Sequence, residues 1–119
     1  MSYQFFATDA QNPRPSLRRR LLETRILDPA CGSGTCPVLA IARMRALGSA
    51  LMVDEGDLLH AILRNVAGFD LNPLAVLTAR VNYLLSLTDL LEYRRGDVTI
   101  PIYLADSVRM PAVGETLEA

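Results

Sequence analysis

The sequence predicts an α/β fold, a partial Rossmann-like parallel sheet with flanking helices. Three short apolar segments of strand character, at residues 25–28, 66–70 and 100–106, are separated by helical patterns. Such alternation is typical of parallel strands joined by right-handed crossovers. Each segment also ends in an aspartate. The 119 residues are enough for one domain of this kind with a single hydrophobic core.

The N-terminal residues are predicted to precede the sheet as an arm and a short helix. Residues 1–16 are polar and contain two prolines, which favours a loop. The following segment, "SLRRRLLE", is predicted to be a helix with Ser16 as its N-cap. Its three consecutive arginines are interpreted mainly as a solvated face, with contact to nucleic acid as the alternative.

Two helices are predicted between the first and second strands. The first starts near Thr35, because Pro37 is tolerated in a first turn that does not need its N–H group. Gly48 suits its C-terminal stop. The second has Asp54 as N-cap and an apolar face over about two turns.

The helix after the second strand has the clearest start signal in the chain. Asn72 followed by Pro73 is an N-cap residue followed by proline at the first helical position. An apolar stripe then recurs at helical spacing and is predicted to face the core. The stripe consists of Leu74, Leu77, Val81, Leu84 and Leu85.

Composition excludes several classes of protein. The net charge of −1 rules out a chain-wide basic field for nucleic-acid binding. Cys31 and Cys36, with His60 as the one histidine, make neither a zinc site nor a disulfide framework. Both cysteines are predicted to be small buried residues. No apolar run approaches the roughly 20 residues of a membrane span, and the N-terminus lacks a signal-peptide pattern, so we expect a cytoplasmic protein with no membrane contact.

The three strand-ending aspartates are expected to lie along one rim, because carboxyl ends of parallel strands share an edge where ligands bind. After the first of them, Gly32 and Gly34 leave space for a ligand to lie against the backbone. A Walker loop is excluded because the chain has no lysine, and Pro37 stands where a dinucleotide fingerprint needs its third glycine. A nucleoside cofactor without phosphate, S-adenosylmethionine, fits these residues.

Three strings in this sequence resemble a known family. "DPACGSGT" resembles the first motif of the S-adenosylmethionine-dependent adenine-N6 DNA methyltransferases of restriction–modification type. "GFDLNPLAVLTARVNYLL" resembles their second motif and its helix, and "IYLADSV" resembles their third. The resemblance covers roughly residues 25–110. It implies a division into an arm and short helix, 1–24, and a partial S-adenosylmethionine-binding domain, 25–119.

The resemblance also implies roles for individual residues. The methionine part of the cofactor would be lined by Asp28, Ala30, Gly32 and Gly34. Asp70 would accept hydrogen bonds from the ribose hydroxyls, with Leu71 packing on the adenine ring. Asp106 would accept a hydrogen bond from the adenine amino group, with Ser107 beside it. No residue is assigned a catalytic or metal-binding role.

The family's catalytic motif, Asn/Asp-Pro-Pro-Tyr/Phe, is absent from the sequence. Asn72-Pro73 resembles it only in part and is a helix start. The family fold also continues beyond three strands. In this chain the three predicted strands would lie in the spatial order 3-2-1, so strand 1 is expected to have an unpaired apolar edge. The sequence therefore predicts a cofactor-binding fragment, truncated before strand 4 and inactive alone.

Two alternatives remain open from the sequence. The first is a fragment of a methyltransferase that acts on RNA or on a protein glutamine amide, because the first three motifs do not identify the acceptor. The second is a non-catalytic remnant that binds a partner. DNA is the expected partner of the complete enzyme, and self-association or a partner chain is expected at the strand 1 edge.

Overall fold

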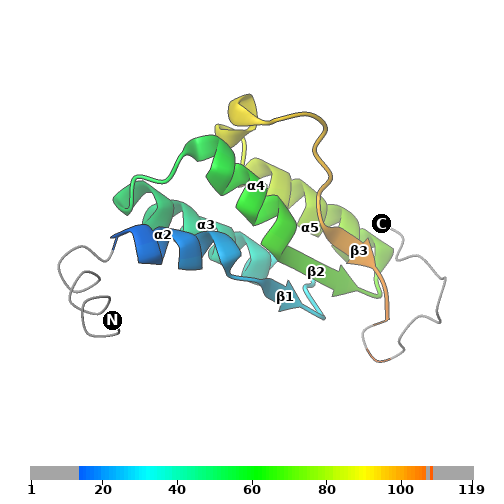
Figure 1. Ribbon diagram of the computed structural model, residues 1–119. Helices are drawn as coiled ribbons and strands as arrows, with labels where there is room; N and C mark the ends of the chain where they lie inside the picture. The colour runs from blue at the N-terminus through cyan, green and yellow to red at the C-terminus, as the bar shows by residue number, and fades with distance from the viewer. Residues whose placement is uncertain (1–13, 107, 109–119) are drawn as a thin grey trace.

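The computed structural model describes residues 14–106 and 108. Its elements lie in the order of the sequence prediction, with strands separated by helices (Figure 1). They are α2 (Arg14–Glu23), β1 (Ile26–Asp28), α3 (Thr35–Ala50), α4 (Glu55–Asn65), β2 (Val66–Asp70), α5 (Pro73–Leu85), the 3₁₀ helix η1 (Leu90–Tyr93) and β3 (Ile102–Leu104).

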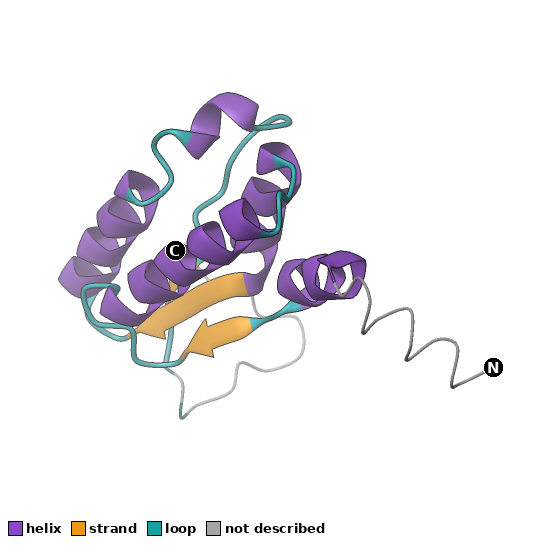
Figure 2. Ribbon diagram, turned by 90° about the vertical axis from the view of Figure 1, so that its left-hand side faces the viewer, coloured by secondary structure: helices purple, strands orange, loops and turns teal. Residues whose placement is uncertain are grey.

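The three strands form one parallel sheet in the order β1-β2-β3, which confirms the predicted α/β class and strand order. Ile26 pairs with Val66, and Gly68 pairs with Ile102. Both connections step in the same direction across the sheet, and right-handed crossovers then place their helices on one face. Figure 2 shows the helices on one side of the strands. Among the described residues, no helix covers the other face.

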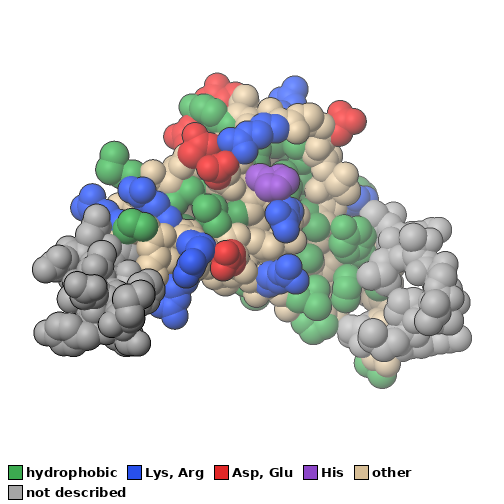
Figure 3. Space-filling model, viewed as in Figure 1, with side chains coloured by type: hydrophobic (Ala, Val, Ile, Leu, Met, Phe, Trp, Pro, Cys, Tyr) green, Lys and Arg blue, Asp and Glu red, His purple; other side chains and the backbone are tan. Residues whose placement is uncertain are grey.

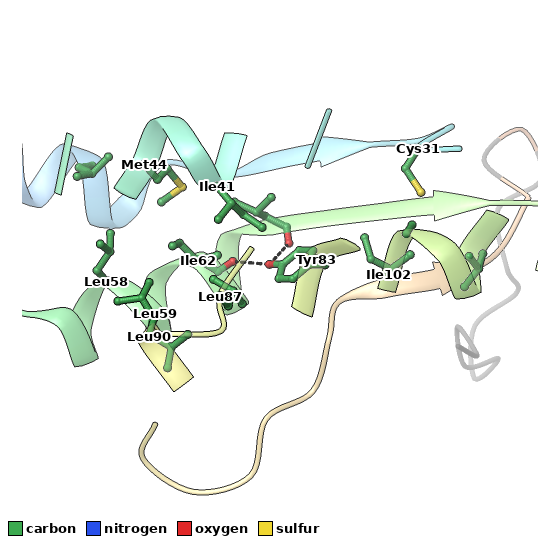
Figure 4. Close-up of a cluster of buried hydrophobic side chains, with 14 residues drawn as sticks. Cys31, Ile41, Met44, Leu58, Leu59, Ile62, Tyr83, Leu87, Leu90 and Ile102 are labelled. Atoms are coloured by element: carbon green, nitrogen blue, oxygen red, sulfur yellow. Dashed lines mark hydrogen bonds between the residues drawn. The ribbon is translucent and has the colours of Figure 1, made fainter. Parts of the chain in front are cut away.

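The core lies between the sheet and these helices (Figure 4). Tyr83 of α5 is fully buried at its centre. Its hydroxyl lies 2.7 Å from the carbonyl oxygen of Val66 and 3.0 Å from that of Ile62, so it donates where α4 passes into β2. Burial raises the pKa of the Tyr83 hydroxyl, which keeps it protonated as a donor.

The N-caps predicted at Asp54 and Asn72 are confirmed. The carboxylate of Asp54 accepts a hydrogen bond of 3.0 Å from the N–H of Asp57 in the first turn of α4. The side-chain oxygen of Asn72 accepts one of 2.9 Å from the N–H of Leu74, with Pro73 at the first position of α5. Both predictions rest on residues adjacent in sequence, for which local chemistry is sufficient.

The N-terminal helix differs from the prediction. It begins by Arg14, so Ser16 lies inside α2 and is not its N-cap. The helix packs on the domain through buried Leu21. In addition, the amide of Asn65 donates a hydrogen bond of 2.8 Å to the carbonyl oxygen of Leu22, which joins α2 to the end of α4.

The prediction that Gly48 stops α3 is wrong. The helix continues to Ala50, and Gly48 is buried inside it. A Cβ at this position would lie 2.8 Å from a methyl carbon of Leu58, so the glycine allows close packing of α3 against α4. The chain turns instead at Met52, whose φ is 56°. The following helix, α4, has 11 residues, about three turns rather than two.

The prediction that the leucine-rich stripe of α5 faces the core is also wrong. All five of its side chains are exposed: Leu74 70%, Leu77 61%, Val81 48%, Leu84 42% and Leu85 65%. The buried side of α5 is formed by Val76, Ala79 and Tyr83. Small Ala79 permits a close approach to the loop after β1, and that approach decides which side of the helix is inward.

Candidate functional site

The carboxyl ends of the three strands lie at one edge of the sheet. Asp28 and Asp70 are the last residues of β1 and β2, whereas β3 is shorter than the predicted strand 100–106 and ends at Leu104, two residues before Asp106. Each aspartate accepts a hydrogen bond from the backbone N–H two residues further along the chain. The acceptor–donor pairs are Asp28–Ala30 at 3.1 Å, Asp70–Asn72 at 2.9 Å and Asp106–Val108 at 2.9 Å. Each carboxylate therefore shapes the turn that leaves its own strand.

Asp70 also joins two of these turns. Its second carboxylate oxygen accepts a hydrogen bond of 2.9 Å from the N–H of Gly32, in the loop after β1. The N–H groups of Asn72 and Gly32 together lower the pKa of the Asp70 carboxyl, with Asn72 the larger cause. The carboxylate is thus held ionised and oriented at the middle strand of the edge.

The two glycines of the loop serve different purposes. Gly32 has φ 56°, and a Cβ there would meet no atom within 4 Å, so this backbone faces open space. Gly34 has φ 89° and is buried, and its Cβ would lie 3.0 Å from the Cα of Ala79 in α5. Glycine at 34 is therefore explained by packing within the chain, whereas Gly32 borders space that a ligand can use.

The cysteine of the loop packs against the middle strand of the sheet. Cys31 is buried against Gly68 of β2, where a Cβ would come within 3.0 Å of it. Burial raises the pKa of the Cys31 thiol, and the charges of Asp70 and Asp28 raise it further. The protonated form of the thiol, which is the less nucleophilic form, is therefore favoured at neutral pH. Cys36, predicted to be buried, is exposed on the first turn of α3.

Asn82 contributes to this region although its role was not predicted from the sequence. Its amide donates a hydrogen bond of 2.9 Å from α5 to the carbonyl oxygen of Ser33, in the glycine loop. Asn82 is one of the few polar residues in a mainly apolar helix, and that contrast was the available signal. The loop is consequently held from two directions, by Asp70 and by Asn82.

The remaining predicted site residues lie near the edge in different environments. Leu71 projects into solvent with 66% of its surface exposed, beside the turn that Asp70 organises. Ala30 is exposed after β1, and Asp106 is exposed beyond β3. Ser107 lies outside the described residues. The structure brings Asp70 and Gly32 into contact and leaves Asp28 and Asp106 on either side of them.

Two negative observations hold for the part of the chain that the structure describes. It contains no group of three or more His, Cys, Asp or Glu residues that can hold a metal ion. None of its helices combines the length and apolar character needed to cross a membrane.

A cavity of about 390 Å³ lies away from this edge, between α2 and α4. His60, Arg64 and Arg25 line it together with acidic Glu23 and Asp57. Figure 3 shows the histidine in purple among side chains of both charges. The C-terminal ends of two helices converge here and disfavour an anion, so the mixed cluster defines no single ligand class.

The model of one protein family matches residues 6–97, which is 92 of the 119 residues. Its description is MmeI, DNA-methyltransferase domain. The match includes the glycine loop, Asp70 and α5, and it ends before β3 and Asp106. No curated protein and no solved structure matches the chain.

Proposed function

The chain belongs to the family of MmeI DNA-methyltransferase domains, and we propose that it provides the S-adenosylmethionine-binding part of an adenine-N6 DNA methyltransferase of restriction–modification type. The family match supports the DNA-methyltransferase part of this function. The cofactor, the acceptor nitrogen and the roles of individual residues are proposals that rest on the rim of aspartates.

The observation that carries the proposal is the position of Asp70. Its two oxygens are oriented by the N–H groups of Asn72 and Gly32, and each oxygen still has a lone pair for a ligand hydroxyl. We assign the ribose hydroxyls to these lone pairs. The hydrogen bonds that hold the carboxylate ionised also hold it in place, so little conformational entropy is lost when a ligand binds.

The space around the glycine loop fits the methionine part of the same cofactor. The backbone at Gly32 is open to a ligand. Asp28 ends the neighbouring strand β1, and one of its carboxylate oxygens accepts a hydrogen bond from the N–H of Ala30. We assign the methionine part to Asp28, Ala30, Gly32 and the backbone of Gly34. S-adenosylmethionine supplies a methyl group on a sulfonium sulfur when it is bound, and these residues would fix where that sulfur lies.

The adenine ring is assigned to the other side of Asp70. Leu71 offers an exposed apolar side chain for the face of the ring. Asp106, beyond β3, would accept a hydrogen bond from the amino group of the base, with Ser107 beside it. Strands in a sheet are about 4.8 Å apart, so β1 and β3 separate the two ends of the rim by roughly 10 Å, the scale of an extended nucleoside.

The acceptor is the less constrained half of the proposal. The family name specifies DNA, whereas adenine N6 follows from the resemblance of the three motifs. None of the rim residues is assigned to the target base, so the proposed activity of this chain alone is cofactor binding without turnover. RNA or a glutamine amide as acceptor, and a non-catalytic role in binding a partner, remain the alternatives.

Calorimetric titration with S-adenosylmethionine tests the proposal. We expect binding by the wild type and a loss of about tenfold or more in Asp70→Asn, because hydrogen bonds to a charged group are removed. Leu71→Ala is the second variant, since an exposed side chain can be shortened without disturbing the fold. Asp97→Asn, an exposed carboxylate away from the rim, is the matched control.

The outcomes separate clearly. Weaker binding by both rim variants, with the control unchanged and all circular dichroism spectra alike, supports the assignment. Equal affinity in all four proteins would place the cofactor elsewhere. A folded wild type that binds no S-adenosylmethionine would refute cofactor binding by this chain alone.

A further inference from the structure

The outer side of α5 is an apolar surface that no described residue covers. It consists of Leu74, Leu77, Val81, Leu84 and Leu85, which are 42–70% exposed. The inner side of the same helix is apolar as well. A helix with apolar residues on two opposite sides is typical of a position between two layers, and the sheet supplies only one layer here.

The spacing of the outer residues favours a helix as the second layer. Leu74, Leu77, Val81 and Leu84 follow one another at intervals of three, four and three residues. This is the heptad spacing of a coiled-coil seam, in which each side chain enters a gap between four residues of a facing helix. The stripe extends for about three turns, the length of an average helix in globular proteins.

The apolar surface continues beside α5 into a groove against α3. Val38, Leu39 and Leu85 line this groove, whose volume is about 410 Å³. Leu39 is 63% exposed at its outer rim. This groove is large enough to accommodate one large side chain of a facing helix at the end of the seam.

The charges around the stripe specify the partner further. Arg80 is the single charged residue of α5, and α3 has Arg43 and Arg45 but no carboxylate. Arg45 is already paired with Asp89. Arg80 occupies the position flanking the seam, where coiled coils place the charges that select partners. The remaining positive charge is complementary to a helix with glutamates beside its apolar face.

A second copy of this chain fits poorly for the same reason. Two α5 helices packed antiparallel about the middle of the stripe would bring Arg80 of one copy toward Arg80 of the other. Like charges across a helix interface are unfavourable, and the chain has no carboxylate on α5 to offset them.

We propose that the outer face of α5 is a docking surface for an amphipathic α-helix of a partner protein, with an apolar seam flanked by acidic residues. The surface lies on the side of α5 away from the sheet, and the rim of aspartates is not part of it. The proposal is independent of cofactor binding and can fail or hold separately from it.

Synthetic peptides test the proposal directly. Two helical peptides of three heptads have leucine at both seam positions, with glutamate flanking the seam in one and lysine in the other. We expect the glutamate peptide to bind in fluorescence anisotropy and the lysine peptide to bind about fivefold or more weakly. Arg80→Gln should reduce that difference, because it removes the flanking positive charge.

The double variant Leu77→Gln, Val81→Gln should weaken binding of the glutamate peptide about tenfold or more, since the centre of the seam is lost. Leu47→Gln, an exposed leucine of α3 outside the groove, is the matched control. These side chains are exposed, so the variants should keep the wild-type thermal midpoint. Absence of binding, or equal binding of both peptides by wild type and double variant, would overturn the proposal.

Two further measurements address other occupants. Flotation with anionic phosphatidylserine vesicles tests a membrane surface, and sedimentation velocity tests a second copy. The proposal predicts that the double variant changes neither result. Vesicle binding or dimerisation that is abolished by Leu77→Gln, Val81→Gln would replace the acidic helix with that occupant.

Discussion

The carboxylate of Asp70 accepts a hydrogen bond of 2.9 Å from the backbone N–H of Gly32, 38 residues away in the sequence. This contact joins the loop after β1 to the turn after β2. It makes Asp70 responsible for the shape of the candidate site, in which the proposed function also assigns this residue a contact with the ribose hydroxyls.

The first prediction concerns acid stability. The pKa of Asp70 is lowered in the folded chain, so the unfolded chain takes up a proton first as pH falls. The stabilisation from this carboxylate is therefore complete above about pH 5 and is lost as pH falls through the folded pKa. We expect Asp70→Asn to lower the urea midpoint at pH 7 much more than at pH 3.

Asp97→Asn should shift the urea midpoint little at either pH. An equal loss for Asp70→Asn at both pH values would show that ionisation of Asp70 contributes nothing to stability.

The second prediction compares the two glycines of the loop. Gly32→Ala should cost about 1–2 kcal/mol, from the left-handed backbone alone. Gly34→Ala should cost more, because its Cβ also meets the backbone of Ala79, and overpacking adds about 1–3 kcal/mol. Chemical denaturation of both variants measures this order. Equal losses would mean that the approach of α5 to the loop is relaxed easily.

The third prediction concerns Tyr83. Removing its hydroxyl in Tyr83→Phe should cost about 1 kcal/mol, because a buried hydrogen bond to the α4–β2 junction is lost. Tyr83→Ala should cost about 3–5 kcal/mol through the cavity that it leaves. Tyr93→Phe, at an exposed tyrosine, is the control for thermal denaturation. A neutral Tyr83→Phe would mean that the two carbonyl groups are satisfied without the hydroxyl.

The fourth prediction concerns the face of the sheet that no described helix covers, together with the edge at β1. Leu27 of edge strand β1 is 55% exposed, and Phe69 and Tyr103 are neighbours with ring centroids 6.3 Å apart. Parallel sheets are normally covered on both faces, so we expect concentration-dependent self-association or capture of a partner here. Leu27→Glu should lower the mass measured by light scattering, whereas Met52→Glu should leave it unchanged. A wild type that is monomeric at every concentration would contradict self-association.

The strand segments and the N-caps of α4 and α5 were predictable because they depend on short stretches of sequence. "VAGFD" forms β2 with the predicted bounds, and Asp54 and Asn72 cap their helices as expected. The convergence of the aspartates on one edge was predictable too, because alternating strands and helices imply parallel strands.

The orientation of α5 was not predictable from its periodicity. Both of its sides are apolar, so spacing alone does not select the inward one. The selection comes from the close approach of Gly34 to Ala79 and from the burial of Tyr83, contacts between residues far apart in the sequence. Gly48 shows the same limit, because a glycine that stops a helix and one that allows packing against Leu58 look alike in sequence.

The sequence by itself determined the alternation of elements, the parallel sheet, the caps of α4 and α5 and the three aspartates at one edge of the sheet, because these follow from local chemistry and chain connectivity. Only the tertiary structure decided which apolar face of α5 is buried and that Gly34 packs against the chain itself. It alone linked Asp70 to Gly32, since that contact depends on the register between β1 and β2. Interactions between distant segments are set by the packing of whole elements, which no short stretch of sequence encodes.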